Sequence, residues 1–221
     1  MNANRVWNAA RLDYFAAVSS LKTIVIMYIL AFVVGTATKL PIFTLGLTMV
    51  FGVFSAGLVF SVHEKNHSDK LYGILPLKKS EMILGRYLFA LAIGLANVVI
   101  AVALTYLAMI VRGTSLDALQ FYGVLSIGFV YHCFSVGVMY PIYFKFTFAK
   151  AYIFTTLPMY LIFLGAMLIS LKTNILNQMG GFLQFFRDHL YLAPVFGLLA
   201  GLVLWAVSIA VANLIYTRQE I

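Results

Sequence analysis

The fold of this chain is decided by residues 63–81, whose sequence is HEKNHSDKLYGILPLKKSE. This is the only long charged stretch between the chain ends, and a long apolar run lies on each side of it. In a membrane protein, a well-organised polar loop between two apolar runs usually contacts another molecule outside the membrane. We predict that this loop docks on a soluble partner, with catalysis by the loop itself as the alternative.

The composition is that of an integral membrane protein. Apolar residues make up 63% of the 221 residues, and charged residues make up 10%. About 20 helical residues, at about 1.5 Å each, cross a hydrocarbon core of about 30 Å, and several apolar runs reach this length. We predict an all-α membrane protein with six transmembrane helices in a single domain, residues 1–221. The predicted spans are 23–38, 42–62, 82–111, 118–143, 151–171 and 191–216.

Residues 1–22 precede the first span and contain no uninterrupted apolar core. One helical stripe of this segment is formed by Trp7, Ala10, Tyr14, Val18 and Leu21. Such a stripe predicts a helix in the cytoplasmic headgroup plane, anchored by Trp7, Arg11 and Tyr14. A plain N-terminal extension is the alternative.

The outer loop 172–190 begins with a polar, glycine-containing part and continues with phenylalanines at helical spacing. A loop this apolar is not expected to stand free in water. We predict a re-entrant segment between spans five and six, and a surface turn with an aromatic belt is an equal alternative.

Small residues at four-residue spacing predict where the helices approach closely. The clearest pattern is Ala193-x-x-x-Gly197-x-x-x-Gly201, followed by Gly52-x-x-x-Ala56 and Ala90-x-x-x-Gly94. These patterns predict tight packing and say little about oligomers.

The basic residues predict the orientation. With the N-terminus in the cytoplasm, 11 of the 15 Lys and Arg residues lie inside, and positive charge favours that side. Both termini and residues 63–81 are then cytoplasmic in a multi-pass protein of the cell membrane. The net charge of +8 is spread over several loops, which indicates contact with anionic lipid of the bilayer and argues against a nucleic-acid interface.

Acidic residues are missing from the interior of the predicted spans. All seven lie at span borders or in loops, whereas proton-coupled carriers need a carboxylate inside the membrane. Asn97 and His132 are the conspicuous polar residues deep in a span and are candidates for a translocation pathway. An interhelical hydrogen bond is the favoured alternative for His132. The sequence has no Gly-Lys dipeptide and hence no phosphate-binding loop, so ATP would have to be bound by another chain.

The motif His63-Glu64-x-x-His67 has the spacing of a zinc metalloprotease, with Glu64 as general base. A catalytic zinc needs a third ligand, and neither His132 in a span nor His189 on the outer face easily reaches this loop. No proline follows an asparagine, so an element typical of intramembrane zinc proteases is missing. We predict no catalytic residue and no metal ligand, and keep an intramembrane zinc metalloprotease as the alternative.

Residues 64–88, with the pattern EKNxxDKLxxxLPLKKSExILxRYL, resemble the loop between the second and third spans of type 2 ATP-binding-cassette (ABC) exporter permeases. More narrowly, they resemble those of the small six-span permeases of Gram-positive bacteria, which include membrane subunits of exporters for phenol-soluble modulins and related peptides. Residues 141–151, PIYFKFTFAKA, resemble a second recurrent segment between spans four and five, with Thr147 where a glycine is common.

The resemblance implies two permease chains, as a homodimer or a heterodimer, and two copies of an ATPase subunit that binds ATP and Mg. This chain would then carry no cofactor and no enzymatic activity. Residues 63–81 would form the cytoplasmic coupling loop, with Pro76 ending a short helix and Ser80-Glu81 capping the third span. The expected ATPase contacts are Glu64, Asn66, Asp69, Tyr72, Leu75 and Pro76, with Lys145 and Lys150 as a second contact. The implied cargo is an amphipathic, toxin-like or bacteriocin-like peptide, with lipids, drugs and sodium as alternatives.

Overall fold

The structure is a computed structural model that describes residues 3–66, 78–153 and 192–217, together with residues 155, 161, 164, 165 and 189. The predicted all-α fold is confirmed for these residues, because all of their regular elements are α-helices. The helices are α1 (Ala3–Ser19), α2 (Leu21–Ala37), α3 (Pro41–Lys65), α5 (Lys79–Arg112), α6 (Ala118–Lys145) and α10 (Leu192–Thr217).

Four of these helices, α3, α5, α6 and α10, are long and apolar enough to cross a membrane. Helix α2 has 17 residues, or about 26 Å, and meets α1 at an angle of 68°, so the two helices together add at most one span. The described residues therefore contain four or five candidate spans, and the predicted count of six is not established. The predicted fifth span, 151–171, lies mostly outside the described residues, and the predicted re-entrant segment, 172–190, lies outside them except for residue 189.

The ends of the helices follow local chemistry. Pro41 occupies the first turn of α3, where its missing N–H costs nothing, and Gly113 ends α5 in the left-handed conformation with φ of 60°. The backbone N–H of Lys78 donates to Glu81 Oε2 at 3.1 Å and so caps α5. The predicted cap is thus correct for Glu81 but wrong for Ser80, which lies inside the first turn because α5 begins at Lys79.

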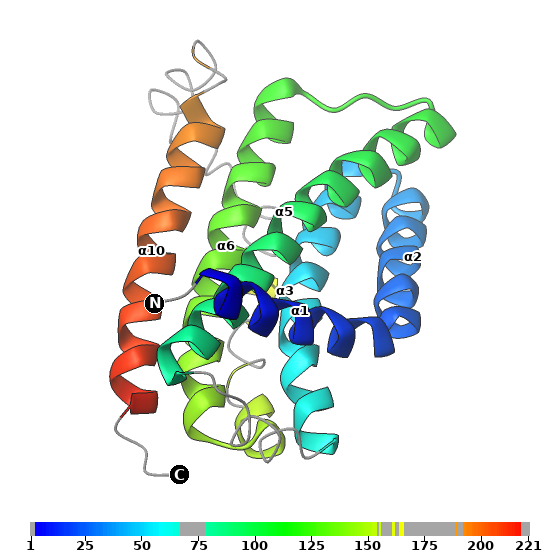
Figure 1. Cartoon of the computed structure of the whole chain (residues 1–221). Helices are drawn as coiled ribbons and strands as arrows, with labels where there is room; N and C mark the ends of the chain where they lie inside the picture. Colours follow the sequence, from blue (N-terminus) through cyan, green and yellow to red (C-terminus); the bar gives the residue numbers. More distant parts are fainter. Residues whose placement is uncertain are drawn as a thin grey trace.

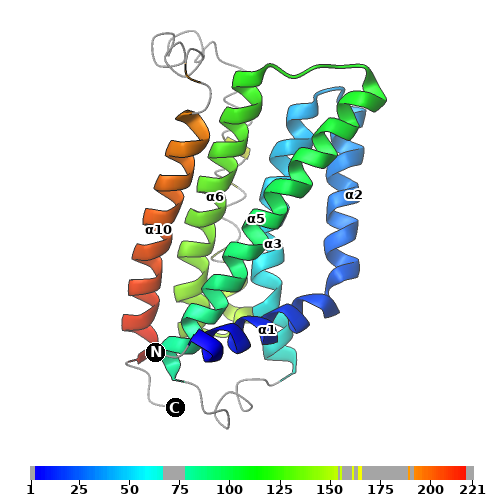
Figure 2. The ribbon, with the colours of Figure 1, turned by 45° about the horizontal axis from the view of Figure 1, so that its top comes forward.

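Helix α1 lies across the bundle, whereas the other helices run along it (Figure 2). Its buried face carries mostly alanines, and it packs on α5 at Gly85, where an added Cβ would lie 2.5 Å from Ala9 Cβ and 2.8 Å from the carbonyl oxygen of Val6. Of the predicted stripe, Trp7, Tyr14 and Val18 point the other way and are 62%, 56% and 39% exposed, whereas Ala10 belongs to the buried face at 6%. This arrangement agrees with an interfacial helix that packs on protein through small residues and turns aromatic residues outward.

The predicted close approaches are confirmed within the chain. A Cβ added to Gly197 of α10 would lie 2.9 Å from Ser126 Cβ of α6, and one added to Gly201 would lie 3.0 Å from Cys133 Sγ. Helix α3 approaches α5 in the same way at Gly52, which faces Asn97. Figure 1 shows α6 and α10 running side by side along the bundle. Small residues have no large side chain that would hold these helix backbones apart.

Candidate functional site

The candidate site lies where α3 ends and α5 begins, which we call the junction end. There Asp13 of α1 is only 1% exposed and faces two basic side chains from two other helices. His63 Nε2 lies 2.7 Å from Asp13 Oδ1, and Arg86 Nε lies 3.9 Å from the same oxygen. We call Asp13, His63 and Arg86 the ion cluster. A buried charge must be paired, so the ion cluster joins α1, α3 and α5.

Aromatic rings enclose the guanidinium of Arg86. Its Cζ lies 4.6 Å from the ring centre of Phe60 on α3 and 5.4 Å from that of Phe144 on α6. Phe60 also contacts Tyr140 edge to face at 4.8 Å, and the hydroxyl of Tyr140 donates to the carbonyl of Ala56 at 3.2 Å. A desolvated cation–π contact stabilises by about 2 kcal/mol, so these rings extend the junction to α6.

A second ion pair connects α1 to the start of α5. Arg5 Nη1 lies 3.9 Å from Glu81 Oε2, and the side chain of Glu81 is 2% exposed. Because Glu81 also caps α5, this contact holds the first turn of that helix against α1. The two ends of the loop 63–81 are therefore both tied to α1, at His63 on one side and at Glu81 and Arg86 on the other.

The predicted ATPase contacts that the structure describes gather at the junction end. Glu64 Oε2 accepts a hydrogen bond from the backbone N–H of Ala149 at 3.3 Å, which brings the end of α3 to the segment after α6. Asn66, Lys145 and Lys150 are exposed, and each lies within four residues of Glu64 or Ala149 in the sequence. The remaining predicted contacts, Asp69, Tyr72, Leu75 and Pro76, lie outside the described residues.

The two candidates for a translocation pathway are buried inside this chain. The Oδ1 of Asn97 accepts a hydrogen bond from the hydroxyl of Tyr28 at 2.9 Å, which links α5 to α2. His132 Nε2 lies 3.2 Å from the carbonyl oxygen of Ala90, and its ring stacks on Trp205 at 6.2 Å. Both side chains thus make interhelical contacts, and a role of either in transport stays a prediction.

The zinc alternative is not supported by the geometry. His63 is turned toward Asp13, and His67 lies outside the described residues. Among the described residues, no three His, Cys, Asp or Glu side chains gather in a way that would hold a metal ion. Within the described part of the chain, His63 therefore contacts Asp13 and belongs to no cluster of metal ligands.

Sequence reasoning missed the ion cluster. It placed the acidic residues at span borders or in loops, which is correct for Glu81 at the start of α5 but wrong for Asp13, which lies inside α1, and it did not expect that both would be 1% exposed. A signal was present, since Asp13 lies on the helix face that also carries Ala9, Ala16 and Ala17. A carboxylate on a face of small residues indicates close packing against a basic partner.

The family model described as "ABC-2 family transporter protein" matches residues 12–217, which is nearly the whole chain. No curated protein and no solved structure matches the chain.

Proposed function

We propose, since this chain belongs to the ABC-2 family of transporter proteins, that it is the permease subunit of an ATP-driven exporter of amphipathic peptides. Members of this family are membrane subunits of ABC transporters and work with a separate ABC ATPase subunit. Beyond this family role, we propose that the direction of transport is export, that the cargo is a peptide, and that the loop 63–81 contacts the ATPase.

The observation that carries the coupling proposal is that both ends of the loop 63–81 are tied to α1. An ATPase subunit that pushes on this loop displaces the end of α3 and the start of α5 together. The ion cluster and the Arg5–Glu81 pair then transmit the displacement to α1 and onward to α2. Coupling through buried pairs requires elements with more than one arrangement, and a helix that lies across the bundle is suited to such a movement.

The assembly that we propose contains two permease chains, alike or different, and two ATPase subunits that bind ATP and Mg. The termini and the loop 63–81 face the cytoplasm of a Gram-positive bacterium. Proposed ATPase contacts are Glu64, Asn66, Asp69, Tyr72, Leu75 and Pro76, with Lys145 and Lys150 as the second contact. The hydrogen bond between Glu64 and Ala149 supports this arrangement, because it joins the two proposed contact regions.

The cargo proposal rests on the chemistry of the helices. Their exposed surfaces carry many Leu, Ile, Val, Phe and Tyr side chains. Among the described residues the buried carboxylates are Asp13 and Glu81, and each has a basic partner at the junction end. Apolar and aromatic walls suit an amphipathic molecule better than a metal ion, which requires clustered oxygen ligands. The resemblance to exporters of membrane-active peptides selects peptides within that class.

The test is the ATPase rate of the reconstituted permease–ATPase complex in the presence of amphipathic peptides, drugs and lipids. We expect stimulation by peptides. Stimulation by drugs or lipids and by no peptide would defeat the cargo proposal and leave the exporter proposal standing. ATP turnover by the purified chain alone, at a rate typical of a transporter ATPase, would show that the chain is not a non-catalytic subunit.

A further inference from the structure

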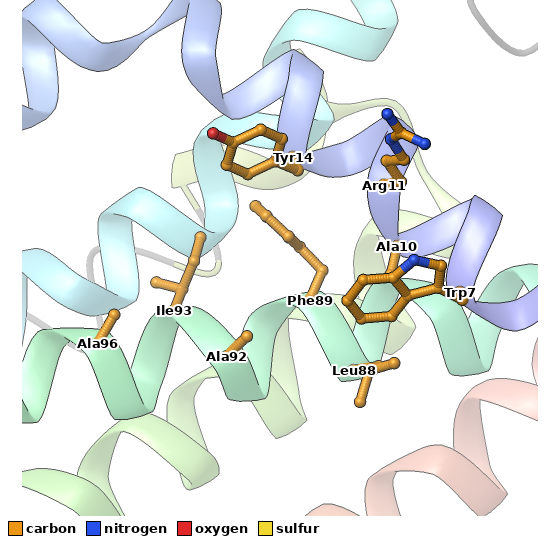
Figure 3. A pocket seen from close by; sticks show the side chains of 9 residues that line it. All are labelled: Trp7, Ala10, Arg11, Tyr14, Leu88, Phe89, Ala92, Ile93 and Ala96. Carbon is orange, nitrogen blue, oxygen red and sulfur yellow. The ribbon is translucent and has the colours of Figure 1, made fainter.

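A groove of about 590 Å³ lies between α1 and α5, on the outer side of the chain. Its α5 wall is formed by Leu88, Phe89, Ala92, Ile93 and Ala96, and its α1 wall by Trp7, Ala10, Arg11 and Tyr14. A volume of this size is within the range of small-molecule sites in proteins. Figure 3 shows the α5 side chains on one side of the groove and the guanidinium of Arg11 on the other, away from Ala92.

The groove is apolar except at its α1 edge. It follows α5 from Leu88 to Ala96, about 12 Å along the helix axis, and small side chains at Ala92 and Ala96 leave the space open. Beyond the groove, Leu95 and Val99 of α5 are 49% and 68% exposed, so the groove continues into the apolar surface that faces lipid in a membrane protein. An occupant can therefore enter directly from the bilayer.

The charge at the α1 edge decides what kind of occupant fits. Arg11 lies on the ring of Phe15 at 5.6 Å, and no carboxylate among the described residues pairs with it. Asp13, the acidic residue of the same helix, is turned to the opposite side and paired with His63. With respect to the described residues, the guanidinium is thus a cation with free hydrogen-bond donors beside an apolar groove, and it matches a phosphate group in both charge and geometry.

We propose that this groove binds one anionic glycerophospholipid, with an acyl chain along α5 from Leu88 to Ala96 and the headgroup phosphate on Arg11. Trp7 and Tyr14 flank the groove at the level where aromatic side chains meet lipid headgroups. The lipid is held between α1 and α5, on the side of α1 opposite the ion cluster, and so stabilises the position of α1. The site does not depend on the identity of the transported cargo.

Trp7 provides the probe, because the chain has two tryptophans and Trp205 is only 5% exposed. The purified chain is placed in phosphatidylcholine vesicles that contain increasing fractions of phosphatidylglycerol brominated on its acyl chains. Bromine quenches the fluorescence of a tryptophan that it contacts, and a Trp7→Phe variant reports the remaining signal of Trp205. The same titration with brominated phosphatidylcholine measures contact with a lipid that has no net charge.

We expect the anionic lipid to quench Trp7 at a mole fraction about fivefold lower than the zwitterionic lipid, as one basic residue near an anionic surface would give. Arg11→Gln should remove this preference, whereas Lys22→Gln, which removes an exposed charge outside the groove, should retain it. Ala92→Leu should weaken quenching by both lipids, because the exposed Ala92 can be enlarged without disturbing the core.

The proposal would be overturned if both lipids quench Trp7 equally and none of these variants changes the quenching. That result would indicate ordinary contact with the bilayer. A Trp7 that is shielded from both lipids in the assembled permease–ATPase complex would also overturn it, because a second chain or the cargo would then cover the groove. The measurement requires no transport, so its outcome is independent of the ATPase assay that tests the proposed function.

Discussion

Replacing Asp13 by Asn tests whether the ion cluster holds the junction end together. Asparagine has almost the same shape as aspartate and retains an oxygen that can accept the bond from His63. It removes the charge that faces Arg86, which is 5% exposed. The variant therefore removes the carboxylate of Asp13 from beside a buried cation and changes little else.

The expected loss of stability follows from the geometry. Removing one partner of a buried ion pair costs about 3–5 kcal/mol. Two features reduce this cost here: the 3.9 Å separation between Arg86 and Asp13 is long for an ion pair, and the rings of Phe60 and Phe144 continue to stabilise the guanidinium. We expect a loss of about 2–3 kcal/mol, which lowers the Tm of a chain of this length by roughly 4–12 °C.

The assay is thermal unfolding of the purified chain in detergent, with Asp117→Asn as control because Asp117 is an exposed acidic residue. The control should stay within about 0.5 kcal/mol of the original stability. In the double variant Asp13→Asn with Arg86→Met, the buried cation is removed together with the carboxylate, and at least half of the loss should be recovered. If Asp13→Asn unfolds at the same temperature as the control, or if the double variant is less stable than Asp13→Asn alone, the ion cluster does not hold the helices as we argue.

Two further substitutions test the packing of α1 and the role of the loop 63–81. Gly85→Ala places a Cβ against the backbone of α1 and should lower the free energy of unfolding by about 1–3 kcal/mol in thermal unfolding. The control Gly123→Ala places a Cβ where nothing lies within 4 Å, and it should not destabilise the chain. Equal effects of the two substitutions would contradict the close contact between α1 and α5. Tyr72→Ala should weaken co-purification with the ATPase subunit while the zinc content of the chain stays near zero, and stoichiometric zinc that is lost in His67→Ala would revive the metalloprotease alternative.

The positions of the helices could be predicted from the sequence because hydropathy and helix-ending residues are local properties. Five of the six predicted spans, 23–38, 42–62, 82–111, 118–143 and 191–216, coincide with α2, α3, α5, α6 and α10 respectively. The ends agree to within three residues. The predicted contacts Glu64 and Lys145 lie together at the junction end because each is within the last two residues of a helix that ends there. The predicted patterns of small residues could likewise be read locally, since glycine spacing alone marks a helix face that tolerates close approach.

The pairing of charges could not be predicted in this way. Asp13, His63 and Arg86 are far apart in the sequence, and the spacing of His63 and His67 suggested zinc although His63 pairs with Asp13. Which side chains meet depends on how each helix is rotated about its axis, and that rotation is decided by contacts such as the one between Gly85 and Ala9. The sequence by itself thus determined an α-helical membrane protein with one polar loop, whereas only the tertiary structure decided that both ends of this loop are bound to α1, because buried charges find their partners through packing rather than through spacing.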